Sequence, residues 1–508
     1  MSDRGEREDV LIEGKKHAPE NLGRVLVLGL GKSGLAAAGY LLALLGGRVS
    51  HLAIAAGAEN ERSRKEAERL REAGADVAFG DDAVAGLAER AGGSFDLCIA
   101  SPGIPAISGF YESAREASAE LISEVEFAWR ESDADSIWVA ITGTNGKTTT
   151  TSLTEHILRQ AGLPAFAVGN IGSTCIERVG ARDAGIYVVE ASSFQLESTR
   201  LFAPNVAVVL NITPDHVEWH GTLQAYADAK WKVLANLSHV PGAYAVLGAA
   251  DDAVRAKIRE IKQVPYDTRG FSYVPVGTAD GVEGDMRARC GSENAAFVNA
   301  DGVLTVALAG TEHELSRRDE LLIKGAHNVE NALCAATCAV VLGVSDDDVA
   351  YGLLTFEPLE HRIEPCGAVR GVECYNDSKA TNVDATLKAF SAFPDKRPIV
   401  LLGGHDKGTD LAPLVEAARA HAKAVVVFGE ARERFLSAFG GAAPASAELP
   451  AVIPADHMQD ALDAALSVAE QGDIVVLSPA CSSFDEFTCY EERGDVFKKL
   501  VADRAARG

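Results

Sequence analysis

The sequence lacks the cysteine pairs and the long apolar runs that are typical of secreted, zinc-binding or membrane-spanning proteins. Its nine cysteines are scattered without a C-x-x-C pair, so we expect reduced thiols rather than a disulfide framework or a zinc site. No apolar run approaches the roughly 18–20 residues of a spanning helix, and residues 1–20 are charged and lack the apolar core of a signal peptide. These absences predict a cytoplasmic protein without membrane insertion.

Basic residues are also few relative to acidic ones. The chain has 48 lysines and arginines against 73 aspartates and glutamates, which gives a formal net charge of -25. This balance disfavours nonspecific binding to nucleic acid or to an anionic membrane, so we expect neither as a partner. Anionic substrates would have to be bound by local groups. The length of 508 residues predicts about three domains of roughly 100–200 residues each.

A glycine-rich loop near residue 145 carries the strongest chemical signal. Residues 137–141 form a short apolar run that is typical of a strand buried in a parallel sheet, and a helix-compatible segment follows the loop. The loop reads Gly-Thr-Asn-Gly-Lys-Thr over residues 143–148, where Lys147 can reach outer phosphates and Thr148 can ligate magnesium. The spacing departs from G-x-x-x-x-G-K-[ST], whose first glycine would fall at Ile141. The pattern still predicts a site for the phosphates of ATP.

A second glycine-rich loop lies near the N-terminus. Residues 24–28 predict a strand that runs into Gly-Leu-Gly-Lys-Ser-Gly over residues 29–34 and then into an alanine-rich helix, which is the context of a dinucleotide-binding motif. The acidic residue expected about 20 positions later to hold an adenosine ribose is absent, because residues 51–56 read His-Leu-Ala-Ile-Ala-Ala. A dehydrogenase is therefore disfavoured, whereas the diphosphate of another nucleotide remains possible. A further strand over residues 95–100 ends in a rigid turn at residues 101–105, on the sheet edge where ligands bind.

Several polar residues of the central region follow predicted strands or begin helices. Glu190 ends an apolar strand, and a carboxylate at that place beside a phosphate loop is typical of a magnesium ligand. His216 follows the next strand and could ligate metal, contact a phosphate or be a hydrogen-bonded surface residue. Lys230 lies on a helix, and the sequence alone predicts that it faces solvent. Asn328 and Asn331 begin a later helix and could both face one ligand.

Strands and helices alternate in the C-terminal part of the chain. The predicted strands are residues 373–375, 398–402, 424–428 and 474–477, and the predicted helices are residues 383–390, 411–422 and 461–471. This alternation predicts a parallel sheet with helices on both faces. Polar loops follow three of the strands, at residues 376–382, 403–407 and 478–484. They would form a small polar pocket in which Lys407 suits a carboxylate substrate.

Four motifs in this order resemble the Mur ligases of peptidoglycan synthesis across nearly the whole chain. They are Thr142–Thr149, Glu190–Glu197, Asn376–Asn382 and Ser478–Asp485. The resemblance implies an α/β fold of three domains: a Rossmann-like domain for a UDP substrate at 1–135, a central P-loop mononucleotide-binding domain at 136–358 and a Rossmann-like domain for an amino-acid acceptor at 359–508. The last three motifs are most similar to the branch that adds D-glutamate to UDP-N-acetylmuramoyl-L-alanine.

The resemblance also implies an ATP-dependent reaction through an acyl phosphate, with roles for particular residues. The catalytic residues would be Lys147, Glu190, His216 and Lys230. Two Mg²⁺ ions are expected, with the metal ligands Thr148, Glu190, His216 and Lys230, the last as a carbamate. The ATP-binding residues would be Gly143, Thr144, Asn145, Gly146, Lys147, Thr148, Thr149, Asn328, Asn331, Arg362 and Asp377.

The two other substrates have implied contacts as well. The UDP substrate would be bound by Gly31, Lys32, Ser33, Ser101, Gly103, Asn170 and His216. D-Glutamate would be bound by Thr381, Lys407, Ser483 and Phe484. The expected partners are these small molecules alone, and we expect a monomer. The sequence departs from the family at residues 54–57, which lack the polar groups that contact uracil in relatives, so no uracil contacts are assigned there.

Other interpretations share part of this pattern. Another Mur ligase or a folylpolyglutamate synthase would have the same ATP loop and a different acceptor, and the C-terminal loops favour D-glutamate over those. A nucleotide-sensing protein that binds without reacting would be favoured by loss of Glu190, His216 or Lys230, and all three are present.

Overall fold

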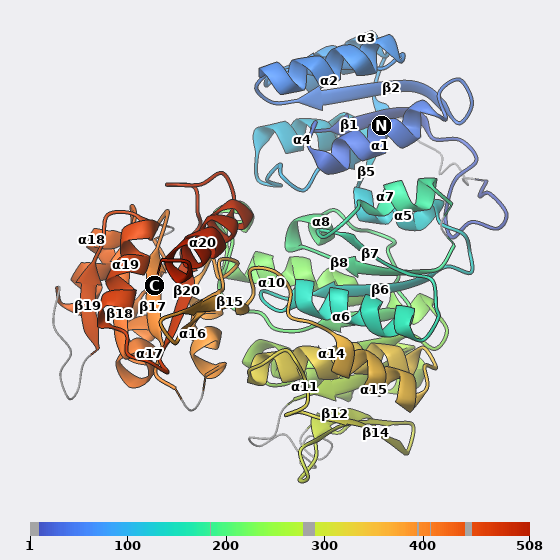
Figure 1. The fold of residues 1–508 in the computed structure, drawn as a ribbon. Coiled ribbons are helices and arrows are strands. Elements are labelled where there is room, and N and C mark those ends of the chain that lie inside the picture. The colour runs from blue at the N-terminus through green and yellow to red at the C-terminus, as the bar shows by residue number, and fades with distance from the viewer. Residues whose placement is uncertain are drawn as a thin grey trace. The chain divides into compact units, whose positions relative to one another are not determined.

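A computed structural model describes residues 10–182, 184–277, 290–393, 396–406, 408–441 and 450–507 of the chain. The strands in these ranges form three sheets with helices packed against them (Figure 1). The predicted α/β fold class is therefore confirmed. Two compact units divide the chain: one holds the residues up to Glu320 together with Glu330–Leu354, and the other holds Leu321–Val329 with the residues from Thr355 onward. The boundaries 135/136 and 358/359 stay predictions.

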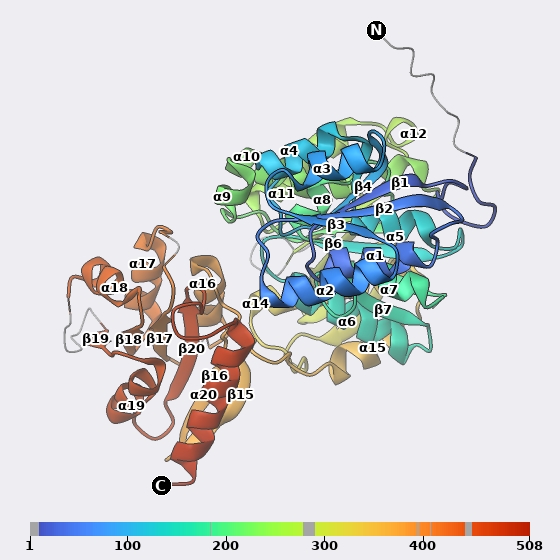
Figure 2. The same cartoon turned by 90° about the horizontal axis from the view of Figure 1, so that it is seen from above.

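The first sheet is parallel, with the strand order β3-β2-β1-β4-β5. Its strands are β1 (Gly23–Leu28), β2 (Val49–Ala56), β3 (Asp76–Phe79), β4 (Phe95–Ala100) and β5 (Ser118–Ser123). Alternate residues of β1 face two helix layers, which Figure 2 shows on either side of the sheet. One layer contains α1 (Lys32–Leu42) and α2 (Glu61–Glu72), and the other contains α3 (Ala83–Arg90) and α4 (Gly109–Glu116). The strand order reverses between β1 and β4, which makes their carboxyl ends the expected ligand-binding edge.

A buried carboxylate fixes the segment that leads from the first sheet to the central one. Glu131 ends α5 (Glu124–Glu131) and is 1% exposed. It accepts two hydrogen bonds of 2.7 Å from the Arg48 guanidinium and one of 2.8 Å from the Tyr40 hydroxyl. The N-terminal segment joins this region because Lys15 Nζ lies 2.7 Å from Asp133 Oδ1. Glu131 is thus buried together with a cation rather than alone, while the Lys15–Asp133 pair is partly exposed.

The central sheet has the strand order β14-β13-β12-β11-β10-β9-β6-β8-β7. Its strands are β6 (Ile137–Thr142), β7 (Ala165–Gly169), β8 (Ile186–Glu190), β9 (Val206–Val209), β10 (Tyr244–Gly248), β11 (Ser272–Val276), β12 (Ala295–Val298), β13 (Val303–Leu308) and β14 (Thr311–Arg317). Pairing is parallel from β7 to β12 and antiparallel for β13 and β14, so β11 to β14 extend one edge of the sheet, and residues 278–289 lie outside the described ranges. Because β6 lies between β8 and β9, the carboxyl ends of these three strands meet at one place.

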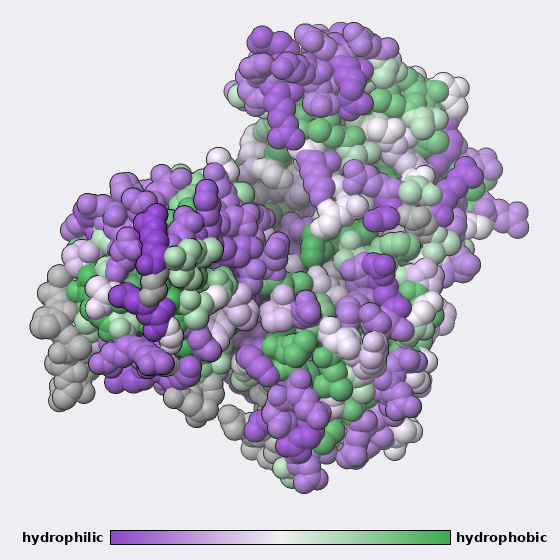
Figure 3. Space-filling model, in the orientation of Figure 1, coloured by the Kyte–Doolittle hydropathy of each residue, from purple (hydrophilic) through white to green (hydrophobic). Residues whose placement is uncertain are grey.

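The helices of the central part follow the strands in turn. They are α6 (Lys147–Gln160), α7 (Cys175–Gly180), α8 (Ser193–Glu197), α9 (Val217–His220), α10 (Leu223–Trp231), α11 (Asp252–Gln263), α12 (Tyr266–Arg269), α14 (Ala326–Val341) and α15 (Asp346–Thr355), with short 3-10 turns at Lys232–Leu234 and Leu237–His239. Within the described ranges, no helix is both long and apolar enough to cross a membrane. Figure 3 shows mainly hydrophilic residues on the visible face, in line with the net charge of -25.

The third sheet has the order β15-β16-β20-β17-β18-β19, with only the β15–β16 pair antiparallel among its described pairings. Its strands are β15 (Glu364–Val369), β16 (Val372–Asn376), β17 (Ile399–Gly403), β18 (Ala424–Phe428), β19 (Ala451–Pro454) and β20 (Ile474–Ala480). One face packs on α19 (Met458–Val468) and α20 (Tyr490–Ala505), and the other packs on α16 (Val383–Ser391), α17 (Ala412–His421) and α18 (Arg432–Phe439). The loops after β16, β17 and β20 lie at one edge, as predicted.

Candidate active site

The loop between β6 and α6 has a backbone that only glycine accommodates. Gly146 has a φ of 87°, and a Cβ added there would lie 2.4 Å from Oδ1 of Asn331. A Cβ at Gly143 would lie 2.9 Å from Cβ of Leu210. The glycines predicted from the sequence are therefore required by both conformation and close approach. The loop ends at Lys147, the first residue of α6, so the backbone N–H groups of a helix N-terminus lie beside the lysine.

Two lysines converge on one carbonyl of this loop. Lys147 Nζ donates to the carbonyl oxygen of Gly143 at 2.9 Å and to that of Thr144 at 2.8 Å. Lys230 Nζ donates to the same Gly143 oxygen at 2.8 Å and is 1% exposed, so the expectation that it faces solvent is wrong. Lys230 lies on the buried face of α10 (Leu223–Trp231) together with Tyr226 and Ala229. The two ammonium groups repel one another.

Burial changes the acidity of Lys230. Removal from water lowers its pKa well below the ordinary value, and the nearby Lys147 lowers it further, while Asp215 and Glu190 oppose this with weaker attraction. The ring of Tyr226 lies under the amine, with its centroid 4.6 Å from Nζ. Burial and the charge of Lys147 thus shift the equilibrium of Lys230 toward the neutral amine.

Glu190 lies at the end of β8, directly beside β6. It pairs with Ile141 across the two strands and is 3% exposed. Asn170 Nδ2 donates to its Oε1 at 2.8 Å, whereas its Oε2 is buried with no hydrogen-bond partner among the described residues. A buried carboxylate oxygen without a donor is costly unless a cation or donor completes it, so this atom suits a metal ligand.

The other residues predicted to bind metal lie at the same edge of the central sheet as Glu190. His216 follows β9 with a φ of 51°, and its Nε2 lies 3.6 Å from Oδ2 of Asp215. Its ring packs against Phe194, with centroids 4.8 Å apart. Thr148 is in the first turn of α6 and part-buried. Among the described residues, no three His, Cys, Asp or Glu side chains cluster closely enough to hold a metal. Any bound cation would therefore need hydroxyl, carbamate or substrate oxygens in addition.

Two residues that the sequence reasoning did not single out shape the loop. Asn211 receives a hydrogen bond from Asn145 N at 2.8 Å and returns one to Asn145 O at 3.0 Å. The Tyr226 hydroxyl lies 2.9 Å from Oγ1 of Thr144. Sequence signals existed for both, because Asn211 follows a predicted strand and Tyr226 precedes Lys230 by one helical turn.

Five of the seven residues predicted for the UDP substrate lie at the first sheet's ligand edge, and the other two, Asn170 and His216, follow β7 and β9 of the central sheet. A Cβ at Gly34 would lie 2.0 Å from the carbonyl oxygen of Gly29. Ser101 follows β4 beside this loop, and its Oγ is buried with no partner among the described residues. Lys32 donates to the carbonyl oxygen of Gly172, which connects the loop to the turn that contains Asn170. Gly31, Ser33 and Gly103 belong to the same two loops.

The loops predicted to hold the acceptor adjoin one another in the third sheet. His405 N, after β17, donates to Ser482 O, after β20, at 2.9 Å. Thr381 is part-buried, Ser483 is 2% exposed and the Phe484 side chain is 69% exposed. Lys407, the residue predicted to bind a carboxylate, lies outside the described residues.

A buried arginine that the sequence reasoning missed holds two of these loops. Arg493, on α20, is fully buried and donates through its Nε to Oγ of Ser378 at 2.9 Å. Its two Nη atoms donate to the carbonyl oxygens of Ser378, Cys481 and Ser482 at 2.9, 3.1 and 3.2 Å. Burial lowers the pKa of Arg493 to about 10. No sequence pattern distinguished it, because it lies within an ordinary charged helix.

The nucleotide residues predicted outside the glycine loop fall in different places. Asn331 accepts from Thr150 Oγ1 at 3.3 Å and so lies against α6. Asn328 donates to the carbonyl oxygen of Lys324 at 2.8 Å. Asp377 belongs to the second compact unit with Arg362, and burial raises its pKa to about 7, opposed by a 2.7 Å hydrogen bond from Ser478 Oγ and by the Arg362 charge.

Known protein families and proteins match this chain along most of its length. The Mur ligase middle domain matches residues 141–339, and the Mur ligase glutamate ligase domain matches residues 361–481. A UDP-N-acetylmuramoylalanine--D-glutamate ligase of Acidobacterium capsulatum is 38% identical over 482 residues, covering 94% of this chain and 96% of the relative. The ligase of the same name from Salinibacter ruber is 38% identical over 487 residues, covering 94% and 97%.

Solved structures support the fold. A pseudomurein peptide ligase type C from Methanothermus fervidus has a TM-score of 0.54 at 18% identity, covering 95% of this chain and 100% of its own. The UDP-N-acetylmuramate-alanine ligase MurC of Thermotoga maritima has a TM-score of 0.51 at 16% identity, covering 95% and 98%. From the matched domains and the identity to full-length relatives, the chain belongs to the Mur ligase family.

Proposed function

We propose that the chain is an ATP-dependent ligase that joins D-glutamate to the alanyl carboxylate of UDP-N-acetylmuramoyl-L-alanine. The observation that carries the proposal is the convergence of Lys147, Lys230 and the buried Glu190 on one phosphate loop. Relatives that cover 94% of the chain carry this activity in their names, which favours D-glutamate over the acceptors of other Mur ligases and of folylpolyglutamate synthases.

The reaction has two steps. The alanyl carboxylate attacks the terminal phosphorus of ATP, and the bond to ADP breaks to give an acyl phosphate. The amine of D-glutamate then attacks the acyl carbon, and the tetrahedral intermediate expels phosphate, leaving an amide and one proton. Lys147 and the loop N–H groups would stabilise the charge that develops on the transferred phosphoryl group. For this, the Lys147 ammonium must exchange the carbonyls of Gly143 and Thr144 for phosphate oxygens.

Magnesium fits the residues at this sheet edge. The unpartnered Oε2 of Glu190 and the hydroxyl of Thr148 would hold Mg²⁺, with His216 and a carbamate of Lys230 at a second ion. Bound Mg²⁺ would neutralise phosphate charge during transfer. The carbamate would form when the neutral Lys230 amine attacks carbon dioxide, making an N–C bond and releasing one proton. The lowered pKa of Lys230 supports this step, because only the neutral amine is nucleophilic.

The remaining assignments are part of the same proposal. ATP would be bound by Gly143 to Thr149 with Asn328, Asn331, Arg362 and Asp377. The UDP substrate would be bound by Gly31, Lys32, Ser33, Ser101, Gly103, Asn170 and His216. D-Glutamate would be bound by Thr381, Lys407, Ser483 and Phe484. The domain ranges 1–135, 136–358 and 359–508, a cytoplasmic location and a monomeric state complete the proposal.

One assay tests the reaction directly. Purified protein is given ATP, Mg²⁺ and UDP-N-acetylmuramoyl-L-alanine with one amino acid at a time, and phosphate release is measured. We expect release with D-glutamate and background release with L-glutamate, L-alanine or a diamino acid. Equal turnover with any of these acceptors would contradict the assignment of D-glutamate. Omission of the UDP substrate is the matched control.

A further inference from the structure

A cavity of about 580 Å³ lies beside the candidate active site, and no residue assigned above lines it. One wall is formed by the first sheet and its helices, through Tyr111 and Arg115 of α4 and Leu121 of β5. The other wall comes from the end of α8, from Trp219 of α9 and from Lys232. This volume is in the range that small-molecule sites usually have.

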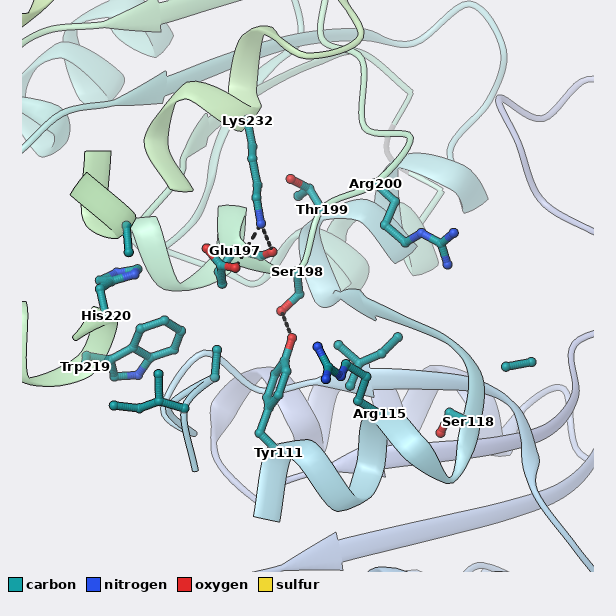
Figure 4. A pocket seen from close by; sticks show the side chains of 15 residues that line it. Tyr111, Arg115, Ser118, Glu197, Ser198, Thr199, Arg200, Trp219, His220 and Lys232 are labelled. Atoms are coloured by element: carbon teal, nitrogen blue, oxygen red, sulfur yellow. Dashed lines mark hydrogen bonds and ion pairs between the residues drawn. The ribbon is translucent and has the colours of Figure 1, made fainter. Parts of the chain in front are cut away.

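The two walls present aromatic surface and positive charge to the same space. Figure 4 shows Tyr111 rising from α4 to bond Ser198, with Arg115 beside it, while Lys232 reaches from the opposite wall to Glu197. The lining contains three cationic side chains, with Arg200 as the third, and one carboxylate, Glu197. Lys232 Nζ already lies 3.0 Å from Oε1 of Glu197, whereas the carboxylates that pair with Arg115 and Arg200 are outside the lining.

The charged pairs in these walls leave room for a competing anion. Arg115 pairs with Glu112 one turn along α4, and both side chains are well exposed, at 63% and 44%. Arg200 lies 3.3 Å from Oε1 of Glu120, a carboxylate that already accepts two bonds from Arg130. The exposed Arg115–Glu112 pair is of a kind that contributes little free energy, so a carboxylate or phosphate could replace Glu112 there at small cost.

An unmatched donor in the wall is a second, independent observation. Trp219 lines the cavity and is 8% exposed, and its indole Nε1 is buried with no hydrogen-bond acceptor among the described residues. Buried donors are nearly always matched in proteins. The ring of Trp219 also packs on Phe194 and His220, with centroids 4.6 and 4.4 Å away, which holds it in place as a fixed surface.

We propose that this cavity binds a small aromatic molecule that carries one carboxylate or phosphate. The ring of the ligand would lie against Trp219 and Tyr111, and its anionic group would contact Arg115 and compete with Glu197 for Lys232. The cavity also lies close to the candidate active site. Nε2 of His220, a residue that lines the cavity, lies 2.9 Å from Oγ of Ser193, and Ser193 begins α8 three residues after Glu190.

The indole N–H signal of Trp219 in a nitrogen-15 NMR spectrum reports on binding in this cavity. The chain has four tryptophans, and Trp219→Phe assigns the signal by its loss. Phenyl phosphate and benzoate are the probes, and inorganic phosphate and cyclohexylamine are the comparisons. We expect phenyl phosphate or benzoate to move the Trp219 signal saturably, with the signals of the other tryptophans as internal references.

Matched variants decide whether the cavity is the site. Arg115→Gln should weaken the probe at least roughly tenfold, because a charge-assisted contact is lost. The control is Arg69→Gln on α2, whose arginine pairs with Glu66 at the same helical spacing, and it should leave the affinity unchanged. Ala225→Phe, which fills the cavity, should abolish the shift. The proposal is overturned if no probe gives a saturable shift or if Arg115→Gln binds like the native chain. It is also overturned if inorganic phosphate binds as tightly as phenyl phosphate, which would mean an adventitious ion only.

Discussion

Two glycine-rich loops, after β1 and after β6, share a strand–loop–helix plan and differ in what stands beside them. The neighbouring strand β4 contributes Ser101 to the first loop, whereas β8 contributes Glu190 to the second. Lys32 leaves the first loop to bond Gly172, while Lys147 bonds carbonyls of its own loop. A neutral hydroxyl suits a diphosphate that is only held, and a buried carboxylate suits a metal that takes part in transfer. The residue at the end of the adjacent strand therefore distinguishes a binding loop from a reacting one.

Exchanging the two lysines for alanine gives the largest expected difference. Lys147→Ala should lower kcat by roughly 10²–10³-fold, because charge on the transferred group loses its main donor. Lys32→Ala should instead raise KM for the UDP substrate roughly tenfold with kcat largely kept. Steady-state phosphate release measures both, and thermal unfolding of each variant checks the fold. Equal effects on kcat would remove the distinction between the loops.

Lys230→Ala should also lose most activity, since the proposed carbamate would be absent. A small carboxylate such as formate should restore part of the rate by filling the vacated position with an anionic oxygen. Lys230→Arg is the matched control, because it keeps a cation that does not form a carbamate at neutral pH, and formate should not rescue it. Full activity of Lys230→Ala would contradict the role.

The sequence predicted the parts of this comparison that depend on local pattern. Strand–glycine–helix order located both loops, and the strand ends located Glu190 and Ser101. Contacts between residues far apart in the chain could not be predicted from local sequence pattern. The burial of Lys230 depends on a fold that brings α10 to Gly143, 87 residues away in the chain. Arg493 contacts carbonyls that any residue carries, so no side-chain pattern in the loops indicated it.

Replacing one glycine of each loop by alanine compares how strongly the two loop backbones constrain the stability of the fold. Gly146→Ala should destabilise the fold by at least about 1–2 kcal/mol, because its φ of 87° is left-handed and a Cβ would lie 2.4 Å from Asn331 Oδ1. Gly31→Ala should fold normally, since nothing lies within 4 Å of a Cβ there. Melting temperatures measure the difference. A Gly146→Ala protein as stable as Gly31→Ala would mean that the central loop is less constrained than its geometry indicates.

The smallest expected effect is a pH dependence that only the central loop should have. Burial lowers the pKa of Lys230 in the folded chain well below 10.5, its ordinary value. Between the pKa of the folded chain and that of the unfolded chain, the unfolded chain therefore binds a proton that the folded chain does not. Stability from this residue should then rise with pH across the interval and fall as the pH is lowered. In buffer free of carbon dioxide, Lys230→Met should remove this slope, which we expect to change the melting temperature by roughly 2–4 °C as the pH rises toward 10.5. Identical pH profiles for the native chain and Lys230→Met would show that the buried amine does not titrate differently on folding.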